Sequence, residues 1–312
     1  MRLIQRIQHL LAQTQAVGSR SITLMAPSLS GCAVCGKAVN AKAAASRPGT
    51  SSYAGEILHT LRHSLCAACC DAIPWLERIK CPICGRGISC EDCTRRPDRH
   101  FVVNRSAVSY DSVMRGWLAL YKYRGYERLA PVLAEMLVPP LLRLTKDISE
   151  SEPIQQQGKS RLRRLIYGFF NKQQLSDYWD AITYVPISAQ RAEDRGFNQA
   201  KEMAAHLSER FGVPLFHLLV RELHSEKMSF KSRAERLRDV RNLFRVDEAE
   251  LRELEEGPLA KQLSPYERRR ALRILLVDDI YTTGSTVEAC SSALLRSANY
   301  DLRIYVLTWS RS

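Results

Sequence analysis

The sequence contains no long uncharged apolar run: nowhere does it approach the roughly 18 consecutive residues that a membrane helix needs. We therefore expect no stable insertion into a membrane. Residues 1–17, MRLIQRIQHLLAQTQAV, carry apolar side chains at helical spacing. Arg6 and several glutamines interrupt them, so the continuous apolar core of a secretory signal is missing. We interpret residues 1–30 as a helical extension that lies on the surface or contacts a partner, and we expect a cytoplasmic protein.

Acidic residues are also in short supply, because 46 Lys and Arg face 33 Asp and Glu, a net charge of +13. This balance suits an anionic partner, either nucleic acid or a polyphosphorylated ligand, but it also occurs on plain solvated surfaces. Two basic stretches, 159–172 and 231–245, are interleaved with aromatic residues, which suits single-stranded nucleic acid through charge and stacking. The aromatic residues are Phe169, Phe170, Phe230 and Phe244.

Internal repetition is confined to cysteine, since eight of the ten cysteines form four Cys-x-x-Cys pairs. Without a secretory signal, such pairs indicate metal binding rather than disulfides. Two pairs complete a tetrahedral site of four thiolates, which leaves no open position for catalysis and makes zinc structural. One or two zinc ions can be held, most simply by Cys32, Cys35, Cys66 and Cys69 and by Cys81, Cys84, Cys90 and Cys93.

The two remaining cysteines have other expected places. Cys70 is either a buried spare thiol or a replacement for Cys69 as a ligand, and Cys290 is expected to be a core thiol. A glycine directly follows the second cysteine in "GCAVCG" and "CPICGR", which is typical of a zinc knuckle. A thioredoxin-like redox role would require one pair in a βαβ setting, whereas these four pairs cluster together.

The rest of the sequence predicts an α/β domain. We expect a cysteine-rich zinc-ribbon domain over 31–100 and a second domain over 101–312. In the second domain, strands expected within 101–113, 179–188, 213–223, 272–279 and 302–310 alternate with helices within 113–137, 197–211, 247–270 and 286–297. This alternation implies βαβ units and a parallel sheet flanked by helices. Residues 147–175 are polar and then basic, and we interpret them as an insertion or mobile loop.

The segment RILLVDDIYTTGSTVEA (273–289) places Asp278 and Asp279 at the end of an apolar strand, where parallel sheets bind ligands. Gly284 lets the backbone turn closely around a ligand. The amides and hydroxyls of 282–286 and the start of the next helix favour a phosphate. The acids alone are also good caps. Beside a phosphate, however, they suit sugar hydroxyls or Mg²⁺, so the segment predicts a site for a phosphorylated ribose.

A second loop, in VPISAQRAEDRGFNQAKEMA (185–204), also follows a predicted strand. Arg191 and Arg195 stand four residues apart, Gly196 permits a close turn, and Asn198 is placed to cap the next helix. Taken alone, the segment could be an exposed charged turn. Beside the first loop, its guanidinium groups suit a pyrophosphate.

The string VDDIYTTGST resembles the phosphoribosyl-pyrophosphate motif of type I phosphoribosyltransferases. The resemblance implies Mg²⁺-dependent transfer of phosphoribose from phosphoribosyl pyrophosphate to an acceptor. Asp278 and Asp279 would then hold the ribose 2′- and 3′-hydroxyls as the catalytic pair, and Arg191, Arg195 and Gly196 would bind the pyrophosphate. The 5′-phosphate would be bound by Thr282, Thr283, Gly284, Ser285 and Thr286.

The cysteine pairs, LYKYRGY (120–126), RGFNQA (195–200) and VDDIYTTGST together resemble the ComF family over roughly residues 31–312. This resemblance implies the type I phosphoribosyltransferase fold preceded by zinc ribbons. It also implies a role in natural transformation, handling single-stranded DNA alongside a helicase and a recombination mediator. Two hypotheses stay open: a phosphoribosyltransferase, and a non-catalytic single-stranded DNA-binding adaptor. Residues 113–126, with Tyr121, Tyr123 and Gly125, are a candidate lid or a surface amphipathic helix.

Overall fold

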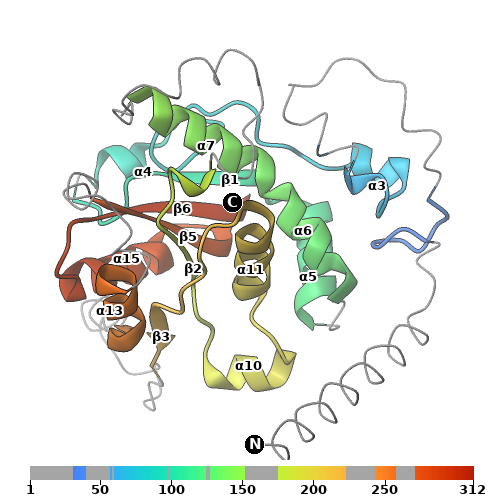
Figure 1. The fold of residues 1–312 in the computed structure, drawn as a ribbon. Coiled ribbons are helices and arrows are strands. Elements are labelled where there is room, and N and C mark those ends of the chain that lie inside the picture. The colour runs from blue at the N-terminus through green and yellow to red at the C-terminus, as the bar shows by residue number, and fades with distance from the viewer. Residues whose placement is uncertain are drawn as a thin grey trace, which may run out of the picture.

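The computed structural model describes residues 31–39, 57, 60–96, 98–123, 127–151, 175–222, 243–257 and 271–312. At its centre is a four-stranded sheet with the strand order β1-β6-β5-β2, in which every neighbouring pair is parallel (Figure 1). The strands are β1 (Asn104–Ser109), β2 (Ala181–Tyr184), β5 (Leu272–Tyr281) and β6 (Leu302–Arg311). Helices flank this sheet, so the α/β class predicted from the alternation is confirmed.

The central strand β5 has apolar residues on both of its faces, as expected when both faces of a sheet are covered. Leu275 and Val277 belong to one core cluster, and their neighbours Ile274 and Leu276 belong to the other. This alternation follows from the period of two in a strand. The strand also continues two residues past Asp279, because Ile280 and Tyr281 still pair with β6.

Two groups of helices cover the two faces of the sheet (Figure 1). One group comprises α5 (Ser112–Tyr123), α6 (Ala130–Met136), α7 (Val138–Ser151) and α11 (Gln199–Phe211). The other comprises α13 (Glu248–Glu256) and α15 (Ser285–Ser297). Within the first group, Glu135 on α6 binds His206 and Arg210 on α11, which holds these two helices together.

The remaining elements are short. They are α3 (Ala67–Asp71), α4 (Glu91–Thr94), the 3-10 helix η2 (Glu127–Leu129), α10 (Ala189–Arg195), β3 (Leu219–Arg221) and β4 (Phe244–Val246). Within the strand expected at 213–223, Leu215 makes a single parallel bridge to Ile182 of β2, and the strand β3 itself is only three residues long and pairs antiparallel with β4. No helix in the part of the chain that the structure describes is long and apolar enough to span a membrane.

The two ends of the expected insertion 147–175 belong to the fold. Residues 147–151 complete α7, where Ile148 is buried, and Leu175 is fully buried at the other end. Trp179 follows and donates a hydrogen bond from Nε1 to Thr145 Oγ1 of α7 at 3.0 Å. Residues 152–174 lie outside the described residues, as do the expected N-terminal helix and most of the two basic stretches.

Candidate functional site

The acidic pair lies at the carboxyl end of the central strand β5. The backbone N–H of Asp279 donates to Asp278 Oδ1 at 2.8 Å. Successive residues of a strand point to opposite faces. Accordingly, the Asp279 carboxylate forms an ion pair with Lys122 of α5, whereas Asp278 lies near Arg221 of β3 and Cys290 of α15.

Asp278 is the more unusual of the two carboxyls. Its burial and the adjacent Asp279 raise its pKa to about 8, although the Asp279 amide, Lys122 and Arg221 act in the opposite direction. Near neutral pH this carboxyl therefore keeps a proton until a cation or a strong donor faces it. Such a group is suited to a ligand that brings hydroxyls or a divalent metal ion.

The loop 282–286 connects this strand to α15, which begins at Ser285 as expected within one residue. Gly284 has φ +80°, and a Cβ atom there would lie only 2.2 Å from the Tyr281 hydroxyl oxygen. Glycine is thus required both by the left-handed backbone and by the space. Thr282, Thr283 and Ser285 are exposed, so their polar groups are open to a ligand at the start of the helix.

We call residues 185–198, which follow β2, the arginine loop. It lies at the same edge of the sheet, because β2 and β5 are neighbouring parallel strands, and Arg191 and Arg195 lie on its short helix α10. Asn198 caps α11 by accepting from Ala200 N at 2.9 Å, as predicted, and its Nδ2 donates to Val185 O at the end of β2. Gly196 ends α10. Arg195 Nη1 donates to Gln199 Oε1 at 3.1 Å, while Arg191 is exposed.

Two basic residues of this site were not predicted. Arg221 lies close enough to both Arg191 and Asp278 to affect their electrostatics, and burial together with Arg191 lowers its own pKa. Lys122 binds Asp279. Arg221 is a single arginine in the apolar run VPLFHLLVREL, and a charge in such a run is the signal that could have identified it. Lys122 lies within the family motif LYKYRGY, which by itself assigns no role to the lysine.

The end of α5 contacts both the acidic end of β5 and the arginine loop. Besides the Lys122–Asp279 pair, the Tyr121 ring packs against Phe197 of the arginine loop, with 5.0 Å between ring centroids. Met114, Trp117 and Tyr121 are all buried, at the spacing of an amphipathic helix packed on the core. For the lid candidate 113–126, this favours the amphipathic-helix interpretation over residues 113–123; residues 124–126 lie outside the described residues.

The eight paired cysteines form two groups with the predicted ligand sets. We call Cys32, Cys35, Cys66 and Cys69 the first tetrad and Cys81, Cys84, Cys90 and Cys93 the second tetrad; within each, the sulfur atoms all lie within 4.8 Å of one another. Four thiolates gathered in this way are a donor set that fits zinc. The two tetrads could therefore hold two zinc ions, in the pairing expected from the sequence.

The surroundings of these sulfur atoms suit metal ligands. Burial opposes ionisation of Cys32, but hydrogen bonds from the backbone amides of Cys35, Cys66 and Val34 lower its pKa to about 7, which favours the thiolate that binds metals. Gly85 follows Cys84 with φ +73°, and a Cβ atom there would lie 2.7 Å from a backbone oxygen, as expected for a zinc knuckle.

The two other cysteines lie in the core. Cys70 is 3% exposed and lies outside the tetrad that includes Cys69, so the alternative in which it replaces Cys69 is not needed. Burial raises its pKa to about 11. Cys290 is fully buried within α15, which confirms the expected core thiol.

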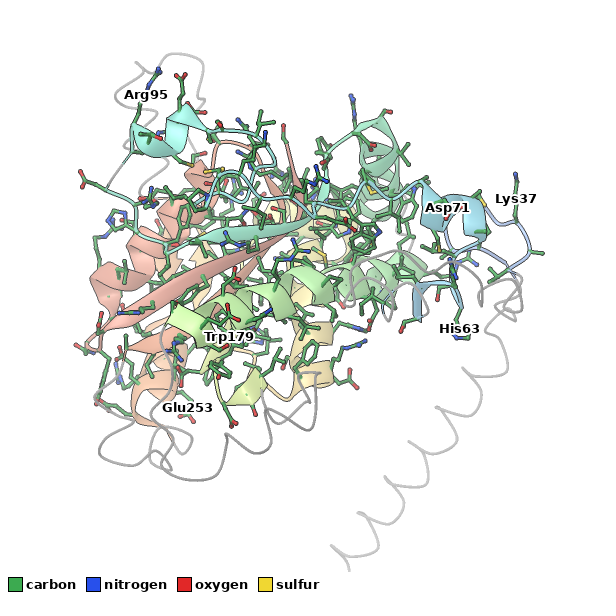
Figure 2. The ribbon with its side chains drawn as sticks, turned by 90° about the horizontal axis from the view of Figure 1, so that it is seen from above. Lys37, His63, Asp71, Arg95, Trp179 and Glu253 are labelled. Atoms are coloured by element: carbon green, nitrogen blue, oxygen red, sulfur yellow. The ribbon has the colours of Figure 1, made fainter. Side chains whose placement is uncertain are left out.

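The tetrads lie at opposite ends of the molecule in both views. Figure 2 shows Lys37 and Asp71, which flank the first tetrad, far from Arg95, which follows α4 of the second. The second tetrad is attached to β1, where Asn104 Nδ2 donates to Cys84 O at 3.0 Å and Arg105 Nη1 donates to Pro82 O at 2.9 Å.

Comparisons with known proteins agree with this arrangement, although no family model matches the chain. Competence protein ComFC of Bacillus subtilis is 28% identical over 240 residues, which cover 74% of this chain and 78% of that protein. Competence protein ComFC of Streptococcus pneumoniae is 23% identical over 255 residues, covering 79% and 90%. Competence protein F of Haemophilus influenzae is 27% identical over 129 residues, covering 41% and 49%. The resemblance to the ComF family predicted from the motifs is thus confirmed: the chain is similar to three competence proteins of this name.

Proposed function

We propose that this protein binds phosphoribosyl pyrophosphate with Mg²⁺ at the carboxyl edge of its sheet, as a type I phosphoribosyltransferase-like protein. The observation that carries the proposal is the end of β5. There, a carboxyl whose pKa is raised to about 8 and a second carboxyl are followed directly by the Gly284 loop at the start of α15. A ligand that carries hydroxyls or a bound cation next to a phosphate could therefore contact the acids and the loop at the same time.

Each part of the ligand has candidate contacts. The 5′-phosphate would be bound by the amides and hydroxyls of the loop 282–286. The ribose 2′- and 3′-hydroxyls would be held by Asp278 and Asp279. The pyrophosphate would face the arginine loop, with Arg191, Arg195 and Gly196. Mg²⁺, when bound, would neutralise charge on the pyrophosphate and bridge it to the ribose.

The basic residues that the sequence did not predict support the same ligand. Lys122 and Arg221 face the acidic pair, and Arg221 also faces Arg191. A cation beside each carboxylate, one of them also near Arg191, would favour a polyanionic ligand bound there. In a transfer reaction, the bond between ribose C1 and the pyrophosphate oxygen breaks, and an acceptor forms a new bond to C1. The bonding electron pair leaves with the pyrophosphate, whose growing charge these residues would stabilise.

Calorimetry tests the proposal directly. The wild-type protein should bind phosphoribosyl pyrophosphate saturably and only with Mg²⁺. Replacing both Asp278 and Asp279 by Asn should weaken binding at least 100-fold. The double variant Glu209→Gln with Glu256→Gln is the matched control, since it makes the same change in net charge at exposed side chains of α11 and α13. Absence of binding by the wild-type protein would refute the proposal.

A link to competence, with single-stranded DNA as a second ligand, is also proposed. It is supported by the names of the three similar proteins and by the net charge of +13. A helicase and a recombination mediator are the partner classes that the family resemblance implies. A fluorescent single strand should bind with strongly salt-dependent affinity, and the Asp278/Asp279 variant should retain that binding. If the strand fails to bind at low salt, the adaptor role is excluded.

A further inference from the structure

We propose that Arg311 couples the second tetrad to the phosphate loop, so that a metal ion bound by this tetrad holds the loop ready for a phosphate. The inference rests on the proposed function of that loop. Arg311, at the end of β6, is 6% exposed and pairs with Tyr281 across the sheet. Its side chain thus lies between the cysteines of the second tetrad and the acidic strand.

The hydrogen bonds of Arg311 reach both sites. Nη2 donates to the sulfur atom of Cys84 at 3.6 Å. Nη1 donates to the carbonyl oxygens of Tyr281 at 3.0 Å and Thr282 at 2.8 Å. A planar guanidinium holds its donors in a fixed geometry, so a displacement at one end of the fork is transmitted to the other.

The two carbonyls determine where the loop amides point. In a trans peptide the C=O and the following N–H lie in one plane and point in opposite directions. Fixing the carbonyls of Tyr281 and Thr282 towards Arg311 therefore turns the N–H groups of Thr282 and Thr283 away from it. Those amides belong to the loop proposed to bind the 5′-phosphate, which makes Arg311 a positioning residue.

Further contacts strengthen the link between the second tetrad and the loop. The Arg311 guanidinium carbon lies 4.7 Å from the centroid of the Tyr281 ring, and the hydroxyl of that ring lies against Gly284. Phe101 packs edge-on against the same ring. The backbone N–H of His100 donates to the Glu288 carboxylate in the first turn of α15, at 3.1 Å.

A metal ion would act through the position of Cys84. Four sulfur ligands around zinc occupy the corners of a tetrahedron, which fixes each sulfur atom. A group that donates a hydrogen bond to a metal-ligand atom orients that atom, and the ligand atom in turn holds the donor in place. With the metal bound, Arg311 would have a fixed thiolate partner, and the loop carbonyls would have a fixed donor. The first tetrad lies at the other end of the molecule. Among the described residues, the hydrogen bonds of Arg311 to a cysteine and to the loop involve Cys84, Tyr281 and Thr282, and none of these belongs to the first tetrad.

The test replaces Arg311 by Met and measures phosphoribosyl pyrophosphate affinity by calorimetry and zinc content by colorimetric titration. We expect about tenfold weaker binding with zinc still present at both tetrads. Arg143→Met is the matched control, because Arg143 Nη1 also donates to two carbonyls, those of Leu76 and Glu77, each at 3.1 Å. That control should bind the ligand as the wild type does. Equal affinity in the Arg311→Met and control variants would overturn the coupling.

A second measurement separates failure of the coupling from failure of the proposed function. Hydrogen exchange of the amides of 280–286 should be faster after Arg311→Met, or after a chelator removes zinc, than in the wild-type protein, with or without ligand. Linkage also requires the ligand to raise the equilibrium affinity of the second tetrad for zinc by the factor by which zinc raises the affinity for the ligand. If the wild type binds no phosphoribosyl pyrophosphate but this exchange still accelerates, the proposed function fails and the coupling holds. Unchanged exchange overturns the coupling.

Discussion

The first and second tetrads have the same four ligands and the same Cys-x-x-Cys pairs, yet they are placed very differently. Cys32 of the first is buried in the core cluster formed with α5, α6 and α7. Cys81 and Cys84 of the second are buried in the cluster that includes Tyr281 of the acidic strand and Val287 of α15. The same metal motif is thus attached in one case to the helical layer and in the other to the candidate ligand site.

On our proposal, the neighbours of a structural metal site give it a wider role. In either tetrad a bound ion would close a loop and stabilise the local fold. Only around the second does the described part of the chain show an arginine that joins a ligand sulfur to the phosphate loop. We expect substitutions at the candidate ligand site to have larger effects on ligand binding than substitutions farther from it.

The largest effect should come from the acidic pair, and it sets the scale against which the tetrads are compared. Binding of phosphoribosyl pyrophosphate should fall at least 100-fold in the Asp278→Asn, Asp279→Asn variant, because both contacts to the sugar are weakened. Zinc content should stay at the wild-type value in both tetrads. Loss of zinc in this variant would show that the acids support the second tetrad as well, and the two sites would then be one structural unit.

The next effect should come from Gly284→Ala, which alters the loop without touching a cysteine. A residue other than glycine in the left-handed region costs about 1–2 kcal/mol, and here the Cβ atom would also meet the Tyr281 hydroxyl. We expect ligand binding to weaken tenfold or more by calorimetry while thermal unfolding shifts only modestly. Wild-type affinity would mean that the loop does not contact the phosphate.

A direct comparison of the tetrads uses Cys66→Ser and Cys90→Ser, which each remove one partly buried ligand. Each variant should lose one equivalent of zinc. Phosphoribosyl pyrophosphate affinity should fall about tenfold in Cys90→Ser and stay within twofold of the wild type in Cys66→Ser, because only the second tetrad is joined to the loop. Equal losses in the two variants would abolish the distinction drawn between the tetrads.

The smallest effect concerns stability and separates the acidic site from both tetrads. The pKa of Asp278 is raised to about 8 in the folded protein, so folding retains a proton that the unfolded chain loses. Stability therefore decreases as pH rises from about 4 towards 8. The substitution Asp278→Asn removes this pH-dependent decrease in stability. The unfolding temperature of the variant should therefore exceed that of the wild type by more at pH 8 than at pH 5. Thermal unfolding without ligand measures this.

Much of the ligand site was predictable because its determinants are local. A continuous apolar run placed β5, the Asx cap at Asn198 placed α11, and a glycine among hydroxylated residues marked the start of α15. The antiparallel pair β3–β4 was not predicted, since an apolar run does not reveal which strand it will pair with.

By itself, the sequence indicated the strands of the parallel sheet, the four Cys-x-x-Cys pairs and the two loops that follow β2 and β5. Each is a pattern within one strand, one loop or one close pair of cysteines, where spacing largely dictates local geometry. Only the tertiary structure decided that Lys122 and Arg221 face the acidic pair, and that Arg311 reaches both Cys84 and the phosphate loop. These contacts join residues far apart in the chain, so they exist only once the strands and helices have packed.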